Sequence, residues 1–461
     1  MISHFAAAKY CMINDLLLQV VLFIRRIRWQ QANPAADDGS LSIRKRAGLF
    51  CPFCFFSPCL HRTGKSYRFA RELLWPRPGK NAIIMLMAAS SLPPYNTYQE
   101  DMFKMEPTYT IIPGNIPNDG ILFVDNEARH RSGHMGHALV EYGPQSMLAF
   151  FSNCSAAIEH GHTGYGWMEY KRTTDGGRTW SPPMVLDYAY QCFLDGTCNI
   201  SCEKAVCTDD GTIVLFCLRN KTITRWEPYL EPTVLRSFDG GVTWTAPQLL
   251  STARGRVMDA RYWNGVLYVL EFCNDAEIKW TGNRPEHVYR LYTSTDNGQT
   301  FEEKSVVPFD TFGRSYGAMD LLPDGRMIVY IYNENDEYHA DFCISPDMGS
   351  TWSAPSGAYF AKRIRNPQIC HANGLYFLHG RSGNNPDKPI HFVLYTSQDG
   401  LHWDEGRFLR LTPPQGRGDM AYYSNNCVTG RFGGETRILI QASDPYREGC
   451  VNVRHWWITF H

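Results

Sequence analysis

Short apolar runs of strand length alternate with turn residues from about residue 105 to the C-terminus. Within four successive units a tight-turn dipeptide separates two such runs, namely Asp210-Gly211, Asn264-Gly265, Asp324-Gly325 and Asn373-Gly374. These dipeptides readily adopt the positive φ angles that a two-residue hairpin between antiparallel strands requires. The hydrophobic pattern therefore predicts an all-β domain over residues 105–461.

A second feature recurs with the hairpins. Five segments follow the pattern Ser/Thr-x-Asp-x-Gly-x-Thr-Trp, with Phe301 in place of Trp in the third and the last one shortened, and their acidic residues are Asp175, Asp239, Asp296, Asp347 and Asp399. The intervals between these residues are 64, 57, 51 and 52 positions. Because the carboxylate can accept N–H bonds within its own turn, we expect the Asp box to be structural rather than catalytic. Each unit reads strand, hairpin, strand, strand, Asp-box turn, strand, which is typical of a propeller blade.

The number of units predicts the ring. Inner hairpins are expected to begin near residues 137, 203, 257, 316, 366 and 419, which gives six blades. The strand near residues 121–124 is expected to complete the last blade and close the ring. A seventh blade is possible only if residues 106–130 hold more structure than their pattern indicates.

The first 104 residues carry no repeat and no sustained period. We interpret them as an irregular or disordered leader, or as upstream sequence read from a mis-assigned start, with Met102 and Met105 as natural alternatives. A cluster of Cys51, Cys54, Cys59 and His61 could ligate zinc in principle, but its spacing is cramped and no second knuckle follows. We therefore predict no metal and no cofactor.

Composition narrows the function classes. The chain is 44% hydrophobic and 20% charged, with a formal net charge of −1, which excludes a disordered polyelectrolyte and gives no case for nucleic-acid binding. No apolar stretch reaches the ~18 residues of a membrane span. The 15 cysteines lie largely in strand-like runs, which indicates reduced thiols. With no convincing signal peptide, these features predict a cytoplasmic protein of unknown oligomeric state.

Basic residues recur in phase with the blades. The predicted inner strands begin near Lys204, Arg256, Arg314, Arg365 and Arg417, and the last four are spaced 58, 51 and 52 residues apart. Arg219 and Arg381, at the ends of second strands, could add to this set. Since the inner strands of a propeller start at one mouth of the channel, we expect a positive rim that binds the carboxylate of an acidic glycan.

The repeated box at this interval makes residues 105–461 resemble the sialidase superfamily. The resemblance implies an Arg-Ile-Pro motif in the first blade for the sialic acid carboxylate, an Asp acid/base before the first box, and a Tyr nucleophile paired with a Glu. The segment Met420-Ala421-Tyr422-Tyr423-Ser424 resembles the nucleophile strand and implies Tyr423 for that role. The first-blade positions hold four histidines instead, His134, His137, His160 and His162.

The arrangement of these histidines resembles that in a second group of propellers, the ulvan and rhamnose–glucuronate lyases. Those enzymes pair two first-blade His with a Tyr and a basic residue. The resemblance implies catalytic roles for His137, His160, Tyr188 or Tyr190, and Lys204, with His134 and His162 as additional candidates. A His or Tyr would take the C5 proton of a uronate whose carboxylate a cation neutralises. Lyase chemistry on an acidic oligosaccharide or polysaccharide is our first hypothesis, hydrolysis through Tyr423 the second, and non-catalytic glycan binding the third.

Overall fold

The computed structural model describes residues 108–157, 165–221, 228–385 and 387–461. The predicted leader, the cysteine cluster that starts at Cys51, and both His160 and His162 lie outside these ranges.

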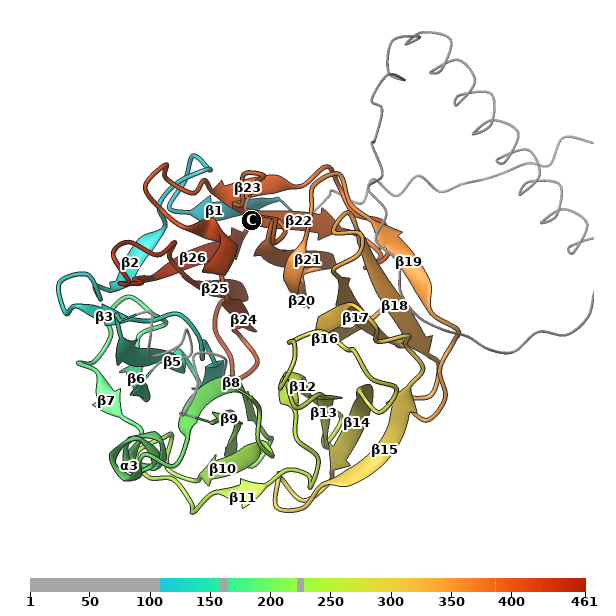
Figure 1. Cartoon of the computed structure of the whole chain (residues 1–461), viewed down its shortest axis with the longest axis horizontal. Coiled ribbons are helices and arrows are strands. Elements are labelled where there is room, and N and C mark those ends of the chain that lie inside the picture. Colours follow the sequence, from blue (N-terminus) through green and yellow to red (C-terminus); the bar gives the residue numbers. More distant parts are fainter. Residues whose placement is uncertain (1–107, 158–164, 222–227, 386) are drawn as a thin grey trace, which may run out of the picture. The chain divides into compact units, whose positions relative to one another are not determined.

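Six small antiparallel sheets surround a central channel (Figure 1), so the predicted six-bladed propeller is confirmed. The inner strands are β4 (Leu139–Gly143), β8 (Asn199–Cys207), β12 (Arg256–Trp263), β16 (Arg314–Leu321), β20 (Arg365–Ala372) and β24 (Ser424–Val428). The second strands are β5 (Ser146–Ser155), β9 (Ile213–Asn220), β13 (Val266–Cys273), β17 (Met327–Asn333), β21 (Leu375–Arg381) and β25 (Arg437–Ser443).

The third strands are β6 (Gly166–Thr173), β10 (Thr233–Ser237), β14 (Val288–Ser294), β18 (His339–Ser345), β22 (Phe392–Ser397) and β26 (Val453–Phe460). The outer strands of the first five blades are β7 (Met184–Val185), β11 (Gln248–Leu249), β15 (Glu302–Val307), β19 (Ser356–Tyr359) and β23 (Arg407–Arg410). A short strand, β3 (Arg131–Ser132), also pairs with β5. The helix α3 (Asp187–Asp195) connects β7 to β8, and the 3-10 turn η2 (Gly418–Met420) precedes β24.

The ring is closed by the N-terminal part of the propeller. The strand β1 (Tyr109–Ile112) pairs with the end of β26, and β2 (Ile121–Val124) pairs with its beginning. The last blade thus combines residues from both ends of the domain. The predicted closing strand at residues 121–124 is confirmed, and β1 extends the same edge.

The Asp boxes lock neighbouring blades together. In the second blade, Asp239 accepts hydrogen bonds from the Thr243 N–H at 2.9 Å and the Thr243 hydroxyl at 2.6 Å. These bonds lower the pKa of Asp239 to about 2. Gly241 has φ of +80°, and a Cβ added there would lie 2.4 Å from Leu148 of the preceding blade. A side chain therefore does not fit, which explains the glycine and confirms the structural role of the box.

Four inner strands contain a bulge at or before the middle of their length. The pairing register shifts between Cys202 and Lys204, Val257 and Asp259, Ser315 and Gly317, and Arg365 and Gln368. A bulge leaves a residue out of the ladder and changes the direction of its side chain. Glu203 and Tyr316 are two of the residues released in this way, and Tyr316 has a φ of +44°.

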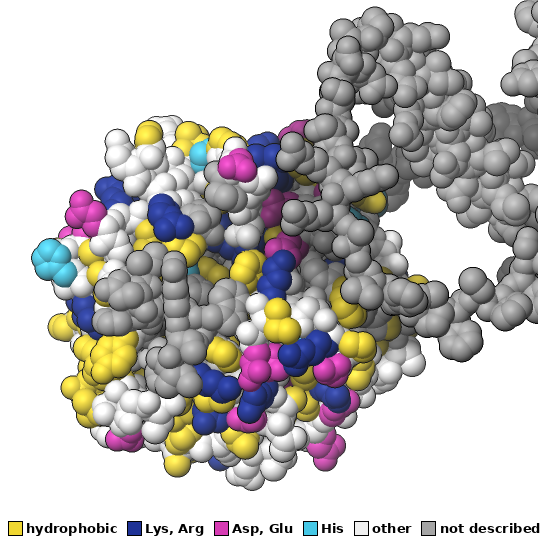
Figure 2. Space-filling model, viewed as in Figure 1, with side chains coloured by type: hydrophobic (Ala, Val, Ile, Leu, Met, Phe, Trp, Pro, Cys, Tyr) yellow, Lys and Arg dark blue, Asp and Glu magenta, His cyan; other side chains and the backbone are white. Residues whose placement is uncertain are grey.

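Basic and acidic side chains are interspersed on the face of the propeller shown in Figure 2, in keeping with the net charge of −1. The described residues drawn there form no broad basic patch. The concentration of positive charge lies inside the ring instead, as described below.

Candidate active site

Two phenols and three guanidinium groups meet at one end of the channel. The hydroxyl groups of Tyr316 and Tyr423 are hydrogen-bonded at 3.1 Å, and Arg365 Nη2 donates to the Tyr316 hydroxyl at 3.4 Å. The guanidinium carbons of Arg256 and Arg381 lie 5.8 and 5.5 Å from the centre of the Tyr423 ring. All five side chains are at most 7% exposed.

The propeller brings each of these groups to the same end of the channel. Arg256 and Arg365 are the first residues of β12 and β20, and Arg381 ends β21 directly opposite Arg365. Tyr316 lies on the bulge of β16, and Tyr423 immediately precedes β24. The inner strands thus bring residues far apart in sequence to a common mouth of the channel.

Glu203 joins the cluster from the bulge of β8. Its Oε2 forms an ion pair with Arg256 at 2.7 Å, while its Oε1 is buried and has no hydrogen-bond partner among the described residues. Glu203 and both tyrosines line a cavity of about 40 Å³, large enough for water but not for a sugar ring. The ring of His134 packs against Tyr423 with centroids 4.6 Å apart.

The cluster alters the protonation of its members. Burial and the neighbouring Arg365 lower the pKa of the Arg381 guanidinium to about 10. Burial raises the pKa of Tyr423 to about 12, whereas Arg365 and Arg256 overcome the opposing effect of burial and lower the pKa of Tyr316. Because the two phenols share a hydrogen bond, these shifts belong to the pair. The positive surroundings favour the loss of one proton from it.

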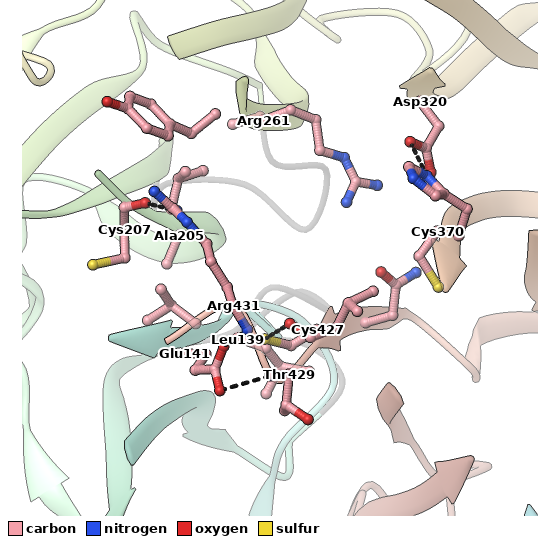
Figure 3. A pocket seen from close by; sticks show the side chains of 18 of the residues that line it. Leu139, Glu141, Ala205, Cys207, Arg261, Asp320, Cys370, Cys427, Thr429 and Arg431 are labelled. Atoms are coloured by element: carbon pink, nitrogen blue, oxygen red, sulfur yellow. Dashed lines mark hydrogen bonds and ion pairs between the residues drawn. The ribbon is translucent and has the colours of Figure 1, made fainter. Parts of the chain in front are cut away.

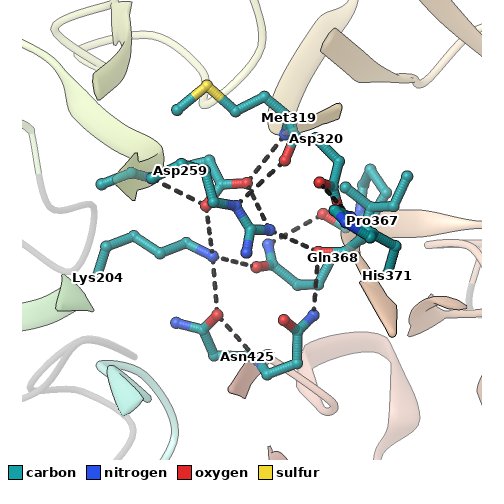
Figure 4. Close-up of polar contacts among 12 residues, drawn as sticks. Lys204, Asp259, Met319, Asp320, Pro367, Gln368, His371 and Asn425 are labelled. Carbon is teal, nitrogen blue, oxygen red and sulfur yellow. Dashed lines mark hydrogen bonds and ion pairs between the residues drawn. The ribbon is translucent and has the colours of Figure 1, made fainter. Parts of the chain in front are cut away.

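Lys204 lines the same cavity as Glu203 and Tyr423, but it lies farther along its strand than predicted. It is the sixth residue of β8 rather than its first, and its ammonium forms an ion pair with Asp259 at 3.2 Å. It also donates to Gln368 and Asn425, as Figure 4 shows. The placement of Lys204 on a basic rim was therefore wrong, because the strand starts earlier than expected and the charge is neutralised inside the ring.

Arg314 and Arg417 do not join the cluster, which corrects the predicted convergence of four arginines. Arg314 forms an ion pair with Asp341 of β18 at 2.7 Å, within its own blade. Arg417 is exposed before η2 and lines a separate surface cleft with Lys388 and His391. The blade period gave their positions along the chain, but the loop conformation and local register decide where each side chain points.

Arg219 and the tyrosines of the helix also lie elsewhere. Arg219 Nη1 is 3.7 Å from Glu231 Oε2, and the Tyr188 hydroxyl is hydrogen-bonded to Thr233 at 3.2 Å. The Tyr190 ring packs edge-on against Trp167. The structure therefore does not bring Tyr188 or Tyr190 to the channel mouth, contrary to the geometry expected of a lyase tyrosine.

His137 lies beside the channel in a chain of buried polar groups. One ring nitrogen is 3.1 Å from the His134 carbonyl and the other is 3.1 Å from the Gln441 side-chain amide. Gln441 also contacts His455. Burial lowers the pKa of His137 to about 4, so the ring is neutral at pH 7. A catalytic role for His137 stays a prediction, as do the roles of His160 and His162.

Sequence reasoning missed Glu203 and Tyr316. Glu203 directly precedes Lys204, the residue that the sequence pattern favours at this position. Tyr316 follows the predicted rim residue Arg314 by two positions. The only available signal was their location near predicted strand starts, because the bulges that release them from the ladder have no clear mark in the sequence.

Within the described ranges, no group of three or more His, Cys, Asp or Glu residues is arranged to hold a metal ion. None of the helices in the same ranges is long and apolar enough to cross a membrane. The eleven cysteines in the described part of the chain are free thiols.

The chain is similar in sequence to a known family and to a bacterial sialidase. Residues 233–421 match the family described as BNR repeat-like domain. A sialidase of Paraclostridium sordellii is 26% identical over 233 residues, which cover 45% of this chain and 54% of that protein. The chain therefore spans about half the length of this relative.

Two solved structures share the fold at low sequence identity. A protein of unknown function from Dyadobacter fermentans superposes with a TM-score of 0.59 at 14% identity, covering 74% of this chain and 98% of the other. The intramolecular trans-sialidase from Ruminococcus gnavus superposes with a TM-score of 0.51 at 12% identity, again covering 74% and 98%. The predicted resemblance to the BNR-repeat propellers of the sialidase superfamily is confirmed.

Proposed function

We propose that this protein is a glycoside hydrolase that removes a carboxylate-bearing sugar from a glycan, with Tyr423 as the nucleophile. One observation carries the proposal: three guanidinium groups surround a hydrogen-bonded pair of phenols. Among the described residues, Glu203 is the carboxylate that balances part of this positive charge, through its ion pair with Arg256. A substrate carboxylate would supply the missing negative charge, and the proposal requires that the cavity of about 40 Å³ widens to admit the sugar. The similarity to a sialidase supports the same class of reaction.

Arg365 is the best placed group to bind that carboxylate. It forms no ion pair with any described carboxylate, and its buried Nη1 has no hydrogen-bond partner among the described residues. A buried donor without a partner costs about 1–3 kcal/mol, and more when it is charged. An incoming carboxylate would accept a hydrogen bond from this nitrogen. Removal of the penalty would then contribute to the free energy of binding.

The chemistry follows from the arrangement of the phenols and Glu203. The Tyr423 oxygen attacks the anomeric carbon, the bond to the leaving oxygen breaks, and the phenol proton passes to the free oxygen of Glu203, directly or through water in the cavity. The leaving oxygen takes a proton from an acid, for which His160 and His162 remain the candidates from the sequence. Water then attacks the same carbon, gives one proton back to that acid and breaks the glycosyl–tyrosine bond, while Glu203 returns its proton to the departing Tyr423 oxygen. A tyrosine nucleophile is a known exception to the two-carboxylate pattern of glycosidases.

Uronate lyase chemistry is the second candidate, since His137 lines the same cavity. Its pKa of about 4 makes it a weak base, however, and both of its ring nitrogens contact protein groups. These contacts favour Tyr423 over His137 as the reactive group.

The deciding experiment measures products and variants together. The enzyme would be given sialyl-lactose and glucuronate-containing oligosaccharides, with free sugar release measured beside ultraviolet absorbance, which only the double bond of a lyase product generates. We expect release without absorbance, a loss of at least about 10³-fold in Tyr423→Phe, and less than a twofold change in Tyr188→Phe, a half-buried tyrosine away from the site. New absorbance, or full activity in Tyr423→Phe, would contradict the proposal, and no turnover of any glycan would favour a binding protein.

A further inference from the structure

A second and larger cavity lies at the other end of the channel. It has a volume of about 510 Å³ and is formed where the inner strands β8, β12, β16, β20 and β24 end (Figure 3). The Tyr423 cluster lies where the same strands begin, and the Lys204–Asp259 network separates the two. A volume of this size is within the range of small-molecule sites, roughly 300–1,000 Å³.

The walls of this cavity, called the lower pocket from here on, combine apolar and polar surface. Six of the residues that contribute to them are Leu139, Val140, Ala205, Val206, Ala260 and Trp263. The thiols of Cys207, Cys370 and Cys427 add polarisable surface to the walls. Burial raises the pKa of each thiol, so all three are neutral. The apolar part of the walls can therefore contact the apolar body of a ligand, while the polar part can bind a charged group.

Arg261 supplies a fixed cationic group in the middle of this surface, as Figure 3 shows. Its Nε donates to the Met319 carbonyl at 3.2 Å, and its Nη2 donates to Asp259 at 3.2 Å and to the Ile369 carbonyl at 2.5 Å. Its Nη1 has no acceptor among the described residues, although the other two nitrogens hold the guanidinium in place. One charged donor is thus oriented in advance for a ligand, which reduces the entropic cost of binding.

The acidic groups of the pocket already have donors. Glu141 accepts from the N–H groups of Gly430 and Arg431 at 2.9 and 3.0 Å, and burial raises its pKa. Asp320 contacts His371 Nδ1 at 2.8 Å, which raises the pKa of that imidazole, and the His371 side chain is 45% exposed. Both carboxylates therefore have donors within the protein, whereas Arg261 Nη1 has no acceptor among the described residues.

We propose that the lower pocket is a second ligand site, which binds a small carboxylic acid with an apolar body. The carboxylate accepts from Arg261 Nη1, and the apolar part lies against the walls around Ala205 and Ala260. Since the lower pocket shares no residue with the Tyr423 cluster, this proposal stands independently of the function assigned above.

The test uses a matched pair of probes on the full chain. Naphthalene-2-carboxylate and naphthalene-2-carboxamide have the same shape, and only the first carries a charge. Calorimetry should give the carboxylate a dissociation constant at or below about 1 mM, the value that ordinary ligand efficiency predicts for a probe of this size, and the amide should bind at least about tenfold more weakly.

Variants then locate the site. Arg261→Met should weaken carboxylate binding at least about tenfold, whereas Arg365→Met, at the other mouth, should leave it within twofold. If Arg261→Met fails to fold, Ala205→Phe fills the pocket without touching the ion pairs and should abolish binding. The proposal is overturned if the carboxylate does not bind, if it binds Ala205→Phe as well as the original protein, or if Arg365→Met removes the binding.

Discussion

Glu271 offers the sharpest test of the electrostatics inside the blades. It lies on β13 with no exposed surface, and neither of its carboxylate oxygens has a hydrogen-bond partner among the described residues. Burial raises its pKa to about 7, against the weaker opposing effects of Ser251 and Arg290. We predict that Glu271→Gln stabilises the propeller at pH 8.

The magnitude follows from the pKa shift. Between the ordinary value of 4.5 and about 7, each unit corresponds to 1.36 kcal/mol, so the penalty above pH 7 is about 3 kcal/mol. In this interval the folded protein keeps a proton that the unfolded chain has lost. The free energy of unfolding therefore falls as pH rises from 4.5 to 7 and then stays low. Glutamine does not ionise, so the variant should lack this decline.

The assay is urea unfolding at pH 5, 6, 7 and 8. The stability difference between Glu271→Gln and the original protein should increase with pH by about 2–3 kcal/mol across this range. Glu303→Gln is the control, because Glu303 forms a half-exposed ion pair with Arg290 and should change stability by less than about 1 kcal/mol at any pH. A difference that is constant with pH, or a loss of stability at pH 8, would refute the reasoning.

Three further predictions concern the site and the ring. Tyr316→Phe should lower kcat by about 10²-fold without unfolding the protein, because it removes the hydroxyl bonded to Tyr423; an unchanged kcat would show that the phenol pair is not used. Lys204→Met should lower the free energy of unfolding by about 3 kcal/mol, since it removes one of two cations paired with Asp259, and thermal melting would check this. Ending the chain after Asp399 should prevent cooperative folding, and a soluble 105–399 fragment with a sharp melting transition would contradict it.

The sequence was a good guide to the fold because Asp boxes and tight hairpins are local signals. Each Asp box depends on residues within one turn, as Asp239 and Thr243 illustrate, so its pattern survives in the chain without tertiary information. The six blades and their order followed directly. Helix α3 was not predicted, since its nine residues carry no clear start signal and its N-cap, Leu186, makes no side-chain capping bond.

The site was predicted only in part for a physical reason. The blade period found Arg256 and Arg365, and the resemblance to a nucleophile strand found Tyr423, all of which lie together. In a strand, however, a shift of one residue turns a side chain to the opposite face. The bulge between Cys202 and Lys204 makes such a shift and brings Glu203 to the cluster instead of its neighbour. Such irregularities arise from packing across the ring, which no single segment of sequence records.

The pairing of β1 with β26 has a consequence for biosynthesis. Thr110 bonds to Thr459, 349 positions later, so a ribosome adding about 5–20 residues per second needs roughly 20–70 s between making the first strand and its partner. During that time β1 has an exposed backbone edge, the kind that recruits other chains. The last blade can form only once β26 has left the ribosome. Nascent chains stalled before Val453 should accordingly remain open to protease, while released chains become resistant.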